Sequence, residues 1–481
     1  MSEKTPTLSK EEEANASVSD DDQGPGKSVP NDDQGPGKSV PNDDQRPGKS
    51  VPDDDQGPGK SVNVATPDDF KSGFNAPPSF EEVMGQNLTS FVPAQPELPP
   101  LCHIDIMPMV IDPGNIRYKK SPVFQPFSSI ITGANVWLQQ HPELLCWKCE
   151  TVERKIDSGT KVNLGVMTHY ESAEGFNAHV MGLRIWFVKK MDGSPPQQLG
   201  VVNVVPEGGV TECVSKVNTS VRSLPGAILN IETATLKYSI GYSKFDPECT
   251  CFCENGADGL RARKTKQIMR VFYVVGRPMN ETVYMKEIQP RQVRFTGTKS
   301  STKFEPFSAM VEQARMWLQS QSGIRVVNIE TRDIQSRDHQ GKVDIFSEKT
   351  DDFLSNSDCI YVRVLRIFYV NTPEVTSYAG TVLSSRLFVP QRGGEKGFEN
   401  MNQTMGRIVS WLASNPLPIF SVETVMFPVT QGGAGLNQER VDYGLVEGGG
   451  KRWLTAIRLY FPVMFQEEVV MQKQSSTCTV L

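Results

Sequence analysis

The segments Val326-Val-Asn-Ile-Glu-Thr331 and Tyr361-Val-Arg-Val-Leu-Arg-Ile-Phe-Tyr-Val370 show the unit from which most of this 481-residue chain is built. Both are rich in β-branched and aromatic residues, which is typical of β-strands. A segment with Glu-Thr followed by a segment with a central Arg occurs four times, and this predicts four tandem structural units. The repeated residues are Glu150, Glu232, Glu330 and Glu423, with Arg184, Arg270, Arg366 and Arg458.

An amphipathic segment precedes the Glu-Thr strand. Residues 127–138 and 307–318 carry apolar side chains at helical spacing, and each follows a Phe-x-Pro-Phe-Ser sequence that suits a first helical turn. Short β-like segments come before the helices, at 116–118, 201–205, 293–295 and 386–389. One unit is therefore predicted as β-α-β-β. The predicted fold class is α+β, with a helix on an antiparallel three-stranded sheet in each unit and the four units arranged as two similar pairs.

The β-α-β-β order is similar to that of dodecin-like small domains, in which a helix packs on a three-stranded antiparallel sheet. Dodecin-like proteins bind flavin between subunits. The resemblance therefore implies, by analogy, a small aromatic ligand between units.

Composition divides the chain into seven segments. Residues 1–62 repeat an 11-residue Asp-, Gly- and Pro-rich sequence and hold 14 acidic against 7 basic residues, so they are expected to be a disordered acidic tail. Unit two is divergent, because Thr219 stands where the other units have Trp. The remaining segments are a Pro-rich linker at 63–100, repeat units at 101–192, 193–280, 281–373 and 374–466, and a flexible tail at 467–481.

Charge and hydropathy exclude several classes of function. The net charge of −6 belongs to the acidic tail, and the near-neutral remainder has no basic stripe for nucleic acid. No stretch approaches the ~20 apolar residues of a membrane span, and the N-terminus is unlike a signal peptide. Nine dispersed cysteines suit a reducing compartment. We therefore expect a cytoplasmic protein.

The repeated Glu and Arg are interpreted as structural. Each alternates with apolar residues, so it points away from the aliphatic face of its strand. On antiparallel neighbouring strands, Glu330 and Arg366 and their counterparts would form cross-strand ion pairs that fix the register. The alternative is a role in contacting a ligand, but an active site seldom occurs four times in one chain.

Two groups of cysteines are candidate metal sites. Cys146 and Cys149 are predicted to be buried strand residues, because positions i and i+3 of a strand point to opposite faces. The segment Cys249-Thr-Cys-Phe-Cys253 lies in a loop-like insertion, and zinc or redox chemistry there is left open. The five histidines form no metal-binding motif, and common enzyme signatures are missing from the sequence. No cofactor, catalytic residue or metal ligand is therefore predicted.

The last four residues, Cys478-Thr-Val-Leu481, resemble the C-a-a-X box of prenylated proteins. The resemblance implies that a geranylgeranyl transferase modifies Cys478. No polybasic run or second cysteine lies nearby, so a single lipid chain would anchor the protein only reversibly, as a peripheral contact with the membrane.

The sequence favours a non-enzymatic scaffold or adaptor that binds protein partners and associates reversibly with membranes. A small-molecule or lipid carrier with a pocket between repeat units is the alternative. An enzyme that uses Cys249, Cys251 and Cys253 is the third possibility.

Overall fold

The structure is a computed structural model in which all described residues belong to one compact unit, Phe74–Leu481. The acidic tail, the Pro-rich linker at 63–100 and the C-terminal tail with Cys478 lie outside the described residues. The described residues are 101–115, 120–171, 177–238, 245–253, 264–293, 303–339, 342–343, 345, 348–353, 359–372, 377–392, 397–429, 437–444 and 451–465.

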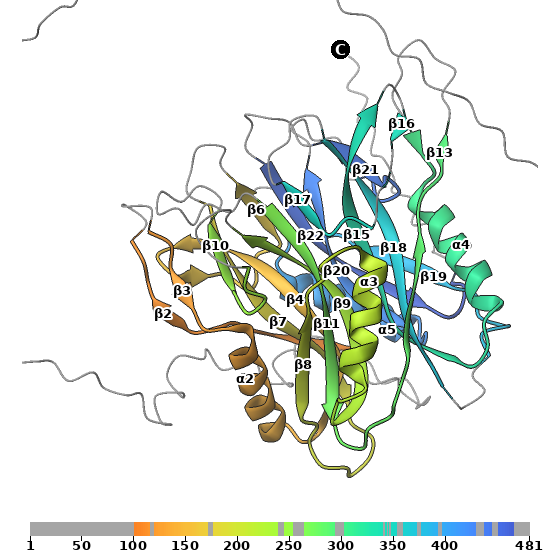
Figure 1. The fold of residues 1–481 in the computed structure, drawn as a ribbon, viewed down its shortest axis with the longest axis horizontal. Helices are drawn as coiled ribbons and strands as arrows, with labels where there is room; N and C mark the ends of the chain where they lie inside the picture. The colour runs from red at the N-terminus through yellow and green to blue at the C-terminus, as the bar shows by residue number, and fades with distance from the viewer. Residues whose placement is uncertain are drawn as a thin grey trace, which may run out of the picture. The chain divides into compact units, whose positions relative to one another are not determined.

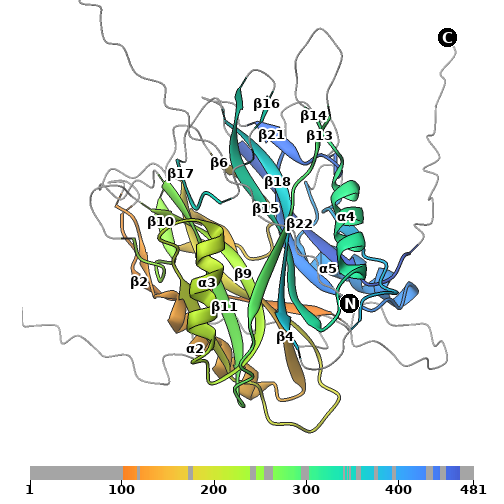
Figure 2. The same ribbon diagram turned by 45° about the vertical axis from the view of Figure 1, so that its right-hand side comes forward.

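The predicted α+β class is wrong, because the described chain is mainly β. About half of it lies in strands and less than a fifth in helices, and four small sheets form a ring that resembles a β-propeller (Figures 1 and 2). Each sheet contains three main antiparallel strands, and the strand with the repeated Arg lies in the middle.

The four sheets follow each other along the chain, each with one helix. The first contains β1 (Cys102–Ile106), α2 (Phe127–Gln140), β4 (Leu144–Ser158) and β7 (Ala178–Lys189). The second contains β8 (Leu199–Val204), α3 (Val210–Val221), β9 (Gly226–Tyr238) and β11 (Lys264–Val275). The third contains β12 (Val283–Ile288), α4 (Phe307–Gln319), β15 (Ile324–His339) and β18 (Cys359–Asn371). The fourth contains β19 (Ser384–Phe388), α5 (Met401–Ser414), β20 (Ser421–Val429) and β22 (Lys451–Phe461).

The first strands of units one and three differ from the prediction. They are β1 and β12, whereas 116–118 and 294–295 lie outside the described residues and Val293 belongs to a small hairpin. Contacts between distant strands explain the difference, because β1 and β12 each place an acidic residue opposite the central Arg of the sheet. Short strands form the hairpins β2 (Val110–Asp112) with β3 (Val123–Phe124) and β13 (Gln292–Val293) with β14 (Lys303–Phe304), and extend β4 and β15 by β5 (Lys161–Val162) and β16 (Lys342–Val343).

Each unit also sends a short strand, here called its arm strand, to the sheet of the preceding unit. The arm strand pairs antiparallel with the Arg strand of that sheet. Unit one pairs in this way with unit four, so the exchange closes the ring. The arm strands are β10 (Cys251–Cys253) on β7, β17 (Asp351–Phe353) on β11, β21 (Asp442–Gly444) on β18 and β6 (Thr168–Glu171) on β22.

The arms also cap the helices of the preceding units. Three residues before β10, the carboxylate of Glu248 accepts a hydrogen bond from the backbone N–H of Ser128 in α2, at 2.7 Å. Glu348 and Glu439 cap α3 and α4 in the same way. A carboxylate here satisfies unpaired N–H groups and interacts favourably with the helix dipole. Unit one has Gly165 at this position, and α5 is capped by its own Asn400.

The hydrophobic cores are shared between successive units. The core around α2, for example, combines Phe127 and Ile185 of unit one with Leu199 and Phe272 of unit two. The cores around α3 and α4 likewise contain residues of the following unit, and the core around α5 contains Leu101 and Trp186 of unit one. The units are therefore not independent helix-on-sheet domains, because each helix buries its apolar face against two sheets.

The inter-unit cap gives a stability prediction. Glu348→Ala removes the carboxylate that accepts from the backbone N–H and the hydroxyl of Thr211. We expect the free energy of unfolding to fall by about 1–2 kcal/mol, as for the loss of a good N-cap. Denaturant unfolding would measure this, with the exposed Glu207→Ala as the control. Equal effects of the two substitutions would contradict a capping role for Glu348.

Candidate functional site

The repeated Glu and Arg meet directly across the strands. Glu150 is the Cα partner of Arg184, and the other three units have the same register. The eight side chains are buried, although they point away from the aliphatic faces, because neighbouring units cover them. These residues thus form a polar layer inside the ring.

The predicted ion pair is seen as a direct contact in unit four, where an Arg458 Nη1 donates to Glu423 Oε1 at 3.0 Å. In the other units, the Arg Nε donates to a residue of the first strand. The acceptors are Asp105 for Arg184 at 2.6 Å, Asn203 for Arg270 at 2.8 Å and Glu287 for Arg366 at 2.8 Å. Unit four has Leu387 at this position, so its arginine uses Glu423.

The pKa values reflect this difference in partners. Burial lowers the pKa of Arg270 to about 10, although Glu232 and Glu248 raise it. Burial raises the pKa of Glu232 above its usual value, although Arg270 and Thr151 lower it. The pKa of Asp105 lies far below its usual range, because Arg184 and Arg154 outweigh the opposing effect of burial.

The glutamates also join the units in a closed circle. Each carboxylate accepts a hydrogen bond from the backbone N–H of the Glu-Thr threonine in the preceding unit. Unit four in turn donates to unit one. The four bonds run from Thr151 to Glu232 at 2.8 Å, Thr233 to Glu330 at 3.1 Å, Thr331 to Glu423 at 2.6 Å and Thr424 to Glu150 at 3.2 Å. Three of the arginines also donate to a threonine hydroxyl of the preceding unit. We call this set of glutamates, threonines and arginines the Glu-Thr circle. Within it, the threonine N–H groups donate to the glutamate carboxylates.

The cysteine predictions are confirmed only in part. Cys146 and Cys149 are buried strand residues as predicted, but their Sγ atoms lie only 3.7 Å apart. The strand register shifts between Cys146 and Lys148, so the extra residue Trp147 brings both thiols to the same side. Burial and Cys146 raise the pKa of Cys149 well above its usual value, so its thiol stays protonated. Cys251 and Cys253 lie on the arm strand β10 and only Cys249 is exposed, so the cluster is not a loop insertion.

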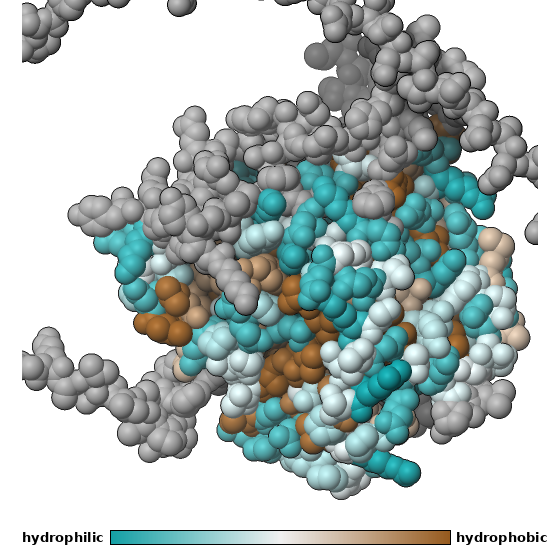
Figure 3. All heavy atoms as spheres, in the orientation of Figure 1, coloured by the Kyte–Doolittle hydropathy of each residue, from teal (hydrophilic) through white to brown (hydrophobic). Residues whose placement is uncertain are grey.

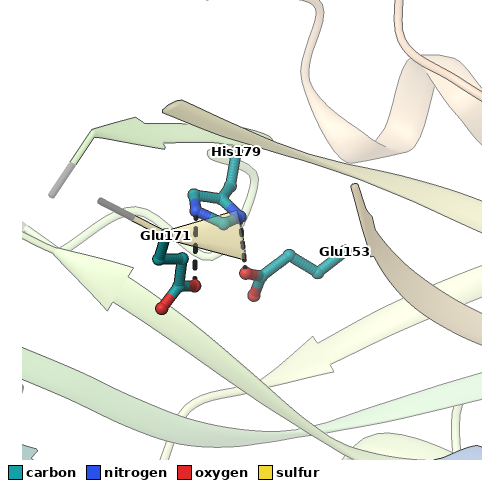
Figure 4. A group of neighbouring side chains, drawn as sticks. All are labelled: Glu153, Glu171 and His179. Carbon is teal, nitrogen blue, oxygen red and sulfur yellow. Dashed lines mark ion pairs between the residues drawn. The ribbon is translucent and has the colours of Figure 1, made fainter. Parts of the chain in front are cut away.

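A second cluster of titratable side chains lies where units one and four meet. Glu153 on β4, Glu171 on β6 and His179 on β7 place their nitrogen and carboxylate oxygen atoms within 4.8 Å of one another. Figure 4 shows both carboxylates directed toward the imidazole of His179. His179 Nδ1 lies 2.9 Å from Glu153 Oε1, and Nε2 lies 3.6 Å from Glu171 Oε1. We call these three residues the His-Glu cluster.

Neighbouring groups keep both carboxylates ionised. The pKa of Glu171 is lowered to about 2, because His169 and Lys237 outweigh the effect of burial, which raises it. The pKa of Glu153 is likewise well below its usual range, with Lys237 and His179 outweighing burial. The cluster adjoins a pocket of about 310 Å³. The pocket is lined by Glu153, Arg154, Lys155, Asp157, Asn163, Val166, Thr168, His169, Tyr170 and Thr455.

Comparison of the chain with protein-family models, with curated proteins and with solved structures finds no match. Among the described residues, no helix has the length and apolar character needed to cross a membrane.

Sequence reasoning missed the His-Glu cluster. Its residues come from three strands and match no short motif. One of them belongs to an arm strand whose partner strand lies some 280 residues later. The sequence signal was weak, because Glu153 and His179 stand at positions that differ between the units. The counterpart of Glu153 in unit two is Thr235, and that of His179 is Thr265.

The Glu-Thr circle predicts a sensitive position at its closing step. The Thr424 hydroxyl donates to Glu150 Oε2 at 2.9 Å and accepts from Arg184 Nη1 at 2.9 Å. Thr424→Val leaves each of these charged groups short of one partner, so we expect a loss of about 1–3 kcal/mol in the free energy of unfolding. Thr424→Ser keeps the hydroxyl and serves as the control in denaturant unfolding. If valine and serine have the same effect, the hydroxyl does not hold the circle together.

Proposed function

We propose that this protein is a non-enzymatic scaffold or adaptor that associates reversibly with membranes from the cytoplasm. The closed Glu-Thr circle is the observation that carries this proposal. The buried repeated glutamates accept hydrogen bonds from the repeated threonines across units, so their carboxylates are used to join the units. Shared cores and exchanged arm strands add stiffness, which suits a platform for partners.

A partner surface is proposed on the hairpin of β2 and β3. Met109, Val110, Ile111 and Val123 are all exposed there, and Ile111 is 63 % exposed. Figure 3 shows apolar residues gathered at the edge of the molecule where Figure 1 places this hairpin. Grouped apolar side chains on a surface are typical of protein contacts, so we assign the hairpin to a protein partner.

The carrier alternative has less support. The pocket beside the His-Glu cluster is lined mostly by charged and polar side chains, which do not suit a lipid. The membrane part of the proposal rests on the sequence Cys478-Thr-Val-Leu481 alone, which lies outside the described residues.

Replacing Cys478 tests the lipid anchor. We expect Cys478→Ser to move the protein from the membrane fraction to the supernatant, because one prenyl chain provides most of the membrane affinity. Cys249→Ser is the matched control, since Cys249 is exposed but lies outside the C-terminal motif. Mass spectrometry of the C-terminal peptide would identify the lipid. Equal membrane partition of both variants would rule the anchor out.

The hairpin gives a separate test of the scaffold. Because Ile111 is exposed, Ile111→Asp should leave the thermal unfolding temperature unchanged. Proximity labelling in cells should show the loss of a defined set of neighbours, while membrane association through Cys478 persists. Met191→Asp, at an 82 % exposed position away from the hairpin, is the control. The same neighbours in wild type and both variants would contradict the partner surface.

A further inference from the structure

We propose that the His-Glu cluster binds one zinc ion at the junction of units one and four. Two carboxylates and one imidazole, from Glu153, Glu171 and His179, converge there from three different strands. Imidazole and carboxylate ligands together suit Zn²⁺, which binds nitrogen and oxygen donors in tetrahedral sites.

The spacing of the donor atoms fits such a site. Zinc bonds of about 2.0–2.2 Å at tetrahedral angles separate ligand atoms by about 3.3–3.6 Å. His179 Nε2 and Glu171 Oε1 are 3.6 Å apart. A Glu153 carboxylate oxygen lies within 4.8 Å of a donor atom of each of the other two residues, and Glu153 Oε1 is 2.9 Å from His179 Nδ1. The Glu153 carboxylate is therefore close enough to supply an oxygen ligand beside the imidazole and the Glu171 carboxylate.

The state of His179 is the second observation that points to an ion. Its side chain is fully buried, and within the described chain neither ring nitrogen makes a hydrogen bond of acceptable geometry. The ring is held by stacking on Phe252, with ring centroids 5.2 Å apart and planes 3° from parallel. A buried imidazole without hydrogen bonds is costly, and coordination of zinc by one nitrogen would satisfy it.

The surroundings support coordination. Trp453 Nε1 donates to Glu171 Oε2 at 2.9 Å, which fixes this carboxylate and leaves Oε1 toward the cluster. His169 Nε2 lies 3.8 Å from Glu171 Oε1 and can supply a fourth donor. His169 and Glu153 also line the 310 Å³ pocket, which gives an ion a path from solvent.

The ammonium group of Lys237 competes with a metal ion for the carboxylate of Glu153. Its Nζ lies 3.3 Å from Glu153 Oε1 and 4.4 Å from the centroid of the Phe252 ring. We infer that this ammonium balances the cluster in the metal-free protein and turns toward solvent when zinc binds. Removing it should therefore strengthen zinc binding.

The other three units carry different residues at the positions of Glu153 and His179. The counterparts of His179, five residues before the repeated Arg, are Thr265, Tyr361 and Trp453. The counterparts of Glu153, three residues after the repeated Glu, are Thr235, Asp333 and Met426. Among the described residues, the full donor set is found where the arm of unit one meets the sheet of unit four.

Zinc uptake by the purified full-length protein tests the proposal. After treatment with a chelator and dialysis against micromolar Zn²⁺, elemental analysis should give one zinc per wild-type chain. Glu171→Gln and His179→Asn should each lose this zinc. Asp157→Asn, which makes the same acid-to-amide change in the pocket lining, should retain it.

Lys237→Met should bind zinc several-fold more tightly in a competition assay with a chelating dye. Glu153→Gln, a less buried position, provides a second ligand variant if Glu171→Gln does not fold.

Cobalt substitution separates this site from the cysteines. Co²⁺ bound by imidazole and carboxylate should give visible d–d bands without a thiolate charge-transfer band, and Glu171→Gln should abolish them. A thiolate band would place the ion on the cysteines and overturn the proposal. Failure of the wild type to take up zinc, or unchanged uptake in folded Glu171→Gln or Glu153→Gln, would overturn it as well. Those outcomes would leave His179 as part of a buried ion-pair network.

Discussion

The hydrogen bond from a threonine N–H to the glutamate carboxylate of the next unit is the constraint on which the rest of the ring depends. A buried carboxylate is strongly disfavoured unless charged or hydrogen-bonding partners replace water. Here one partner of every glutamate belongs to another unit. An isolated unit would therefore leave Glu330, for example, without the N–H of Thr233. The four units are consequently expected to fold as one cooperative ring rather than one by one.

The arms extend the same dependence to the outside of the ring. A helix such as α3 begins without a capping side chain of its own, and Glu348 of the next unit fills that role. The arm strand that follows Glu348 then pairs with β11 of the same sheet. Polar layer, shared core and capped helix thus join the same pairs of units. Because three of the four pairs of units are joined by all three kinds of contact, small rotations between their sheets would break several interactions at once.

The sequence predicted the features that local periodicity controls. Alternation in the two segments around Glu330 and Arg366 was sufficient to place the two residues opposite each other, because side-chain direction in a strand has a period of two. Cys146 and Cys149 are buried strand residues as predicted, but they do not point to opposite faces, because a bulge at Trp147 interrupts that period. No Gly or Pro in the sequence indicates the bulge. The arm strands are only three or four residues long, so they carry too little periodicity to be recognised. Their pairing depends on contacts between units, and these contacts cannot be read from local periodicity. For the same reason the sequence did not predict the His-Glu cluster or the mainly β character of the fold.

The junction of units one and four is where the ring closes. Its Thr424–Glu150 bond joins residues 274 positions apart, against 81 to 97 positions for the other three bonds. Loop-closure entropy grows only with the logarithm of length, so the extra cost of this closure is about 1 kcal/mol.

The junction also lacks the glutamate cap found at the other three, since Gly165 takes its place. Asn400 caps α5 from within unit four. Lys148 donates to the carbonyl of Val422 across the junction, as Asn230 donates to Cys149 and Asn328 to Ile231 at two other junctions. The His-Glu cluster lies beside this junction, where an ion bound by residues from β4, β6 and β7 would tie the arm of unit one to the sheet of the same unit. Because that arm strand is paired with β22, fixing it to its own sheet would also fix unit one to unit four at the point where the ring closes.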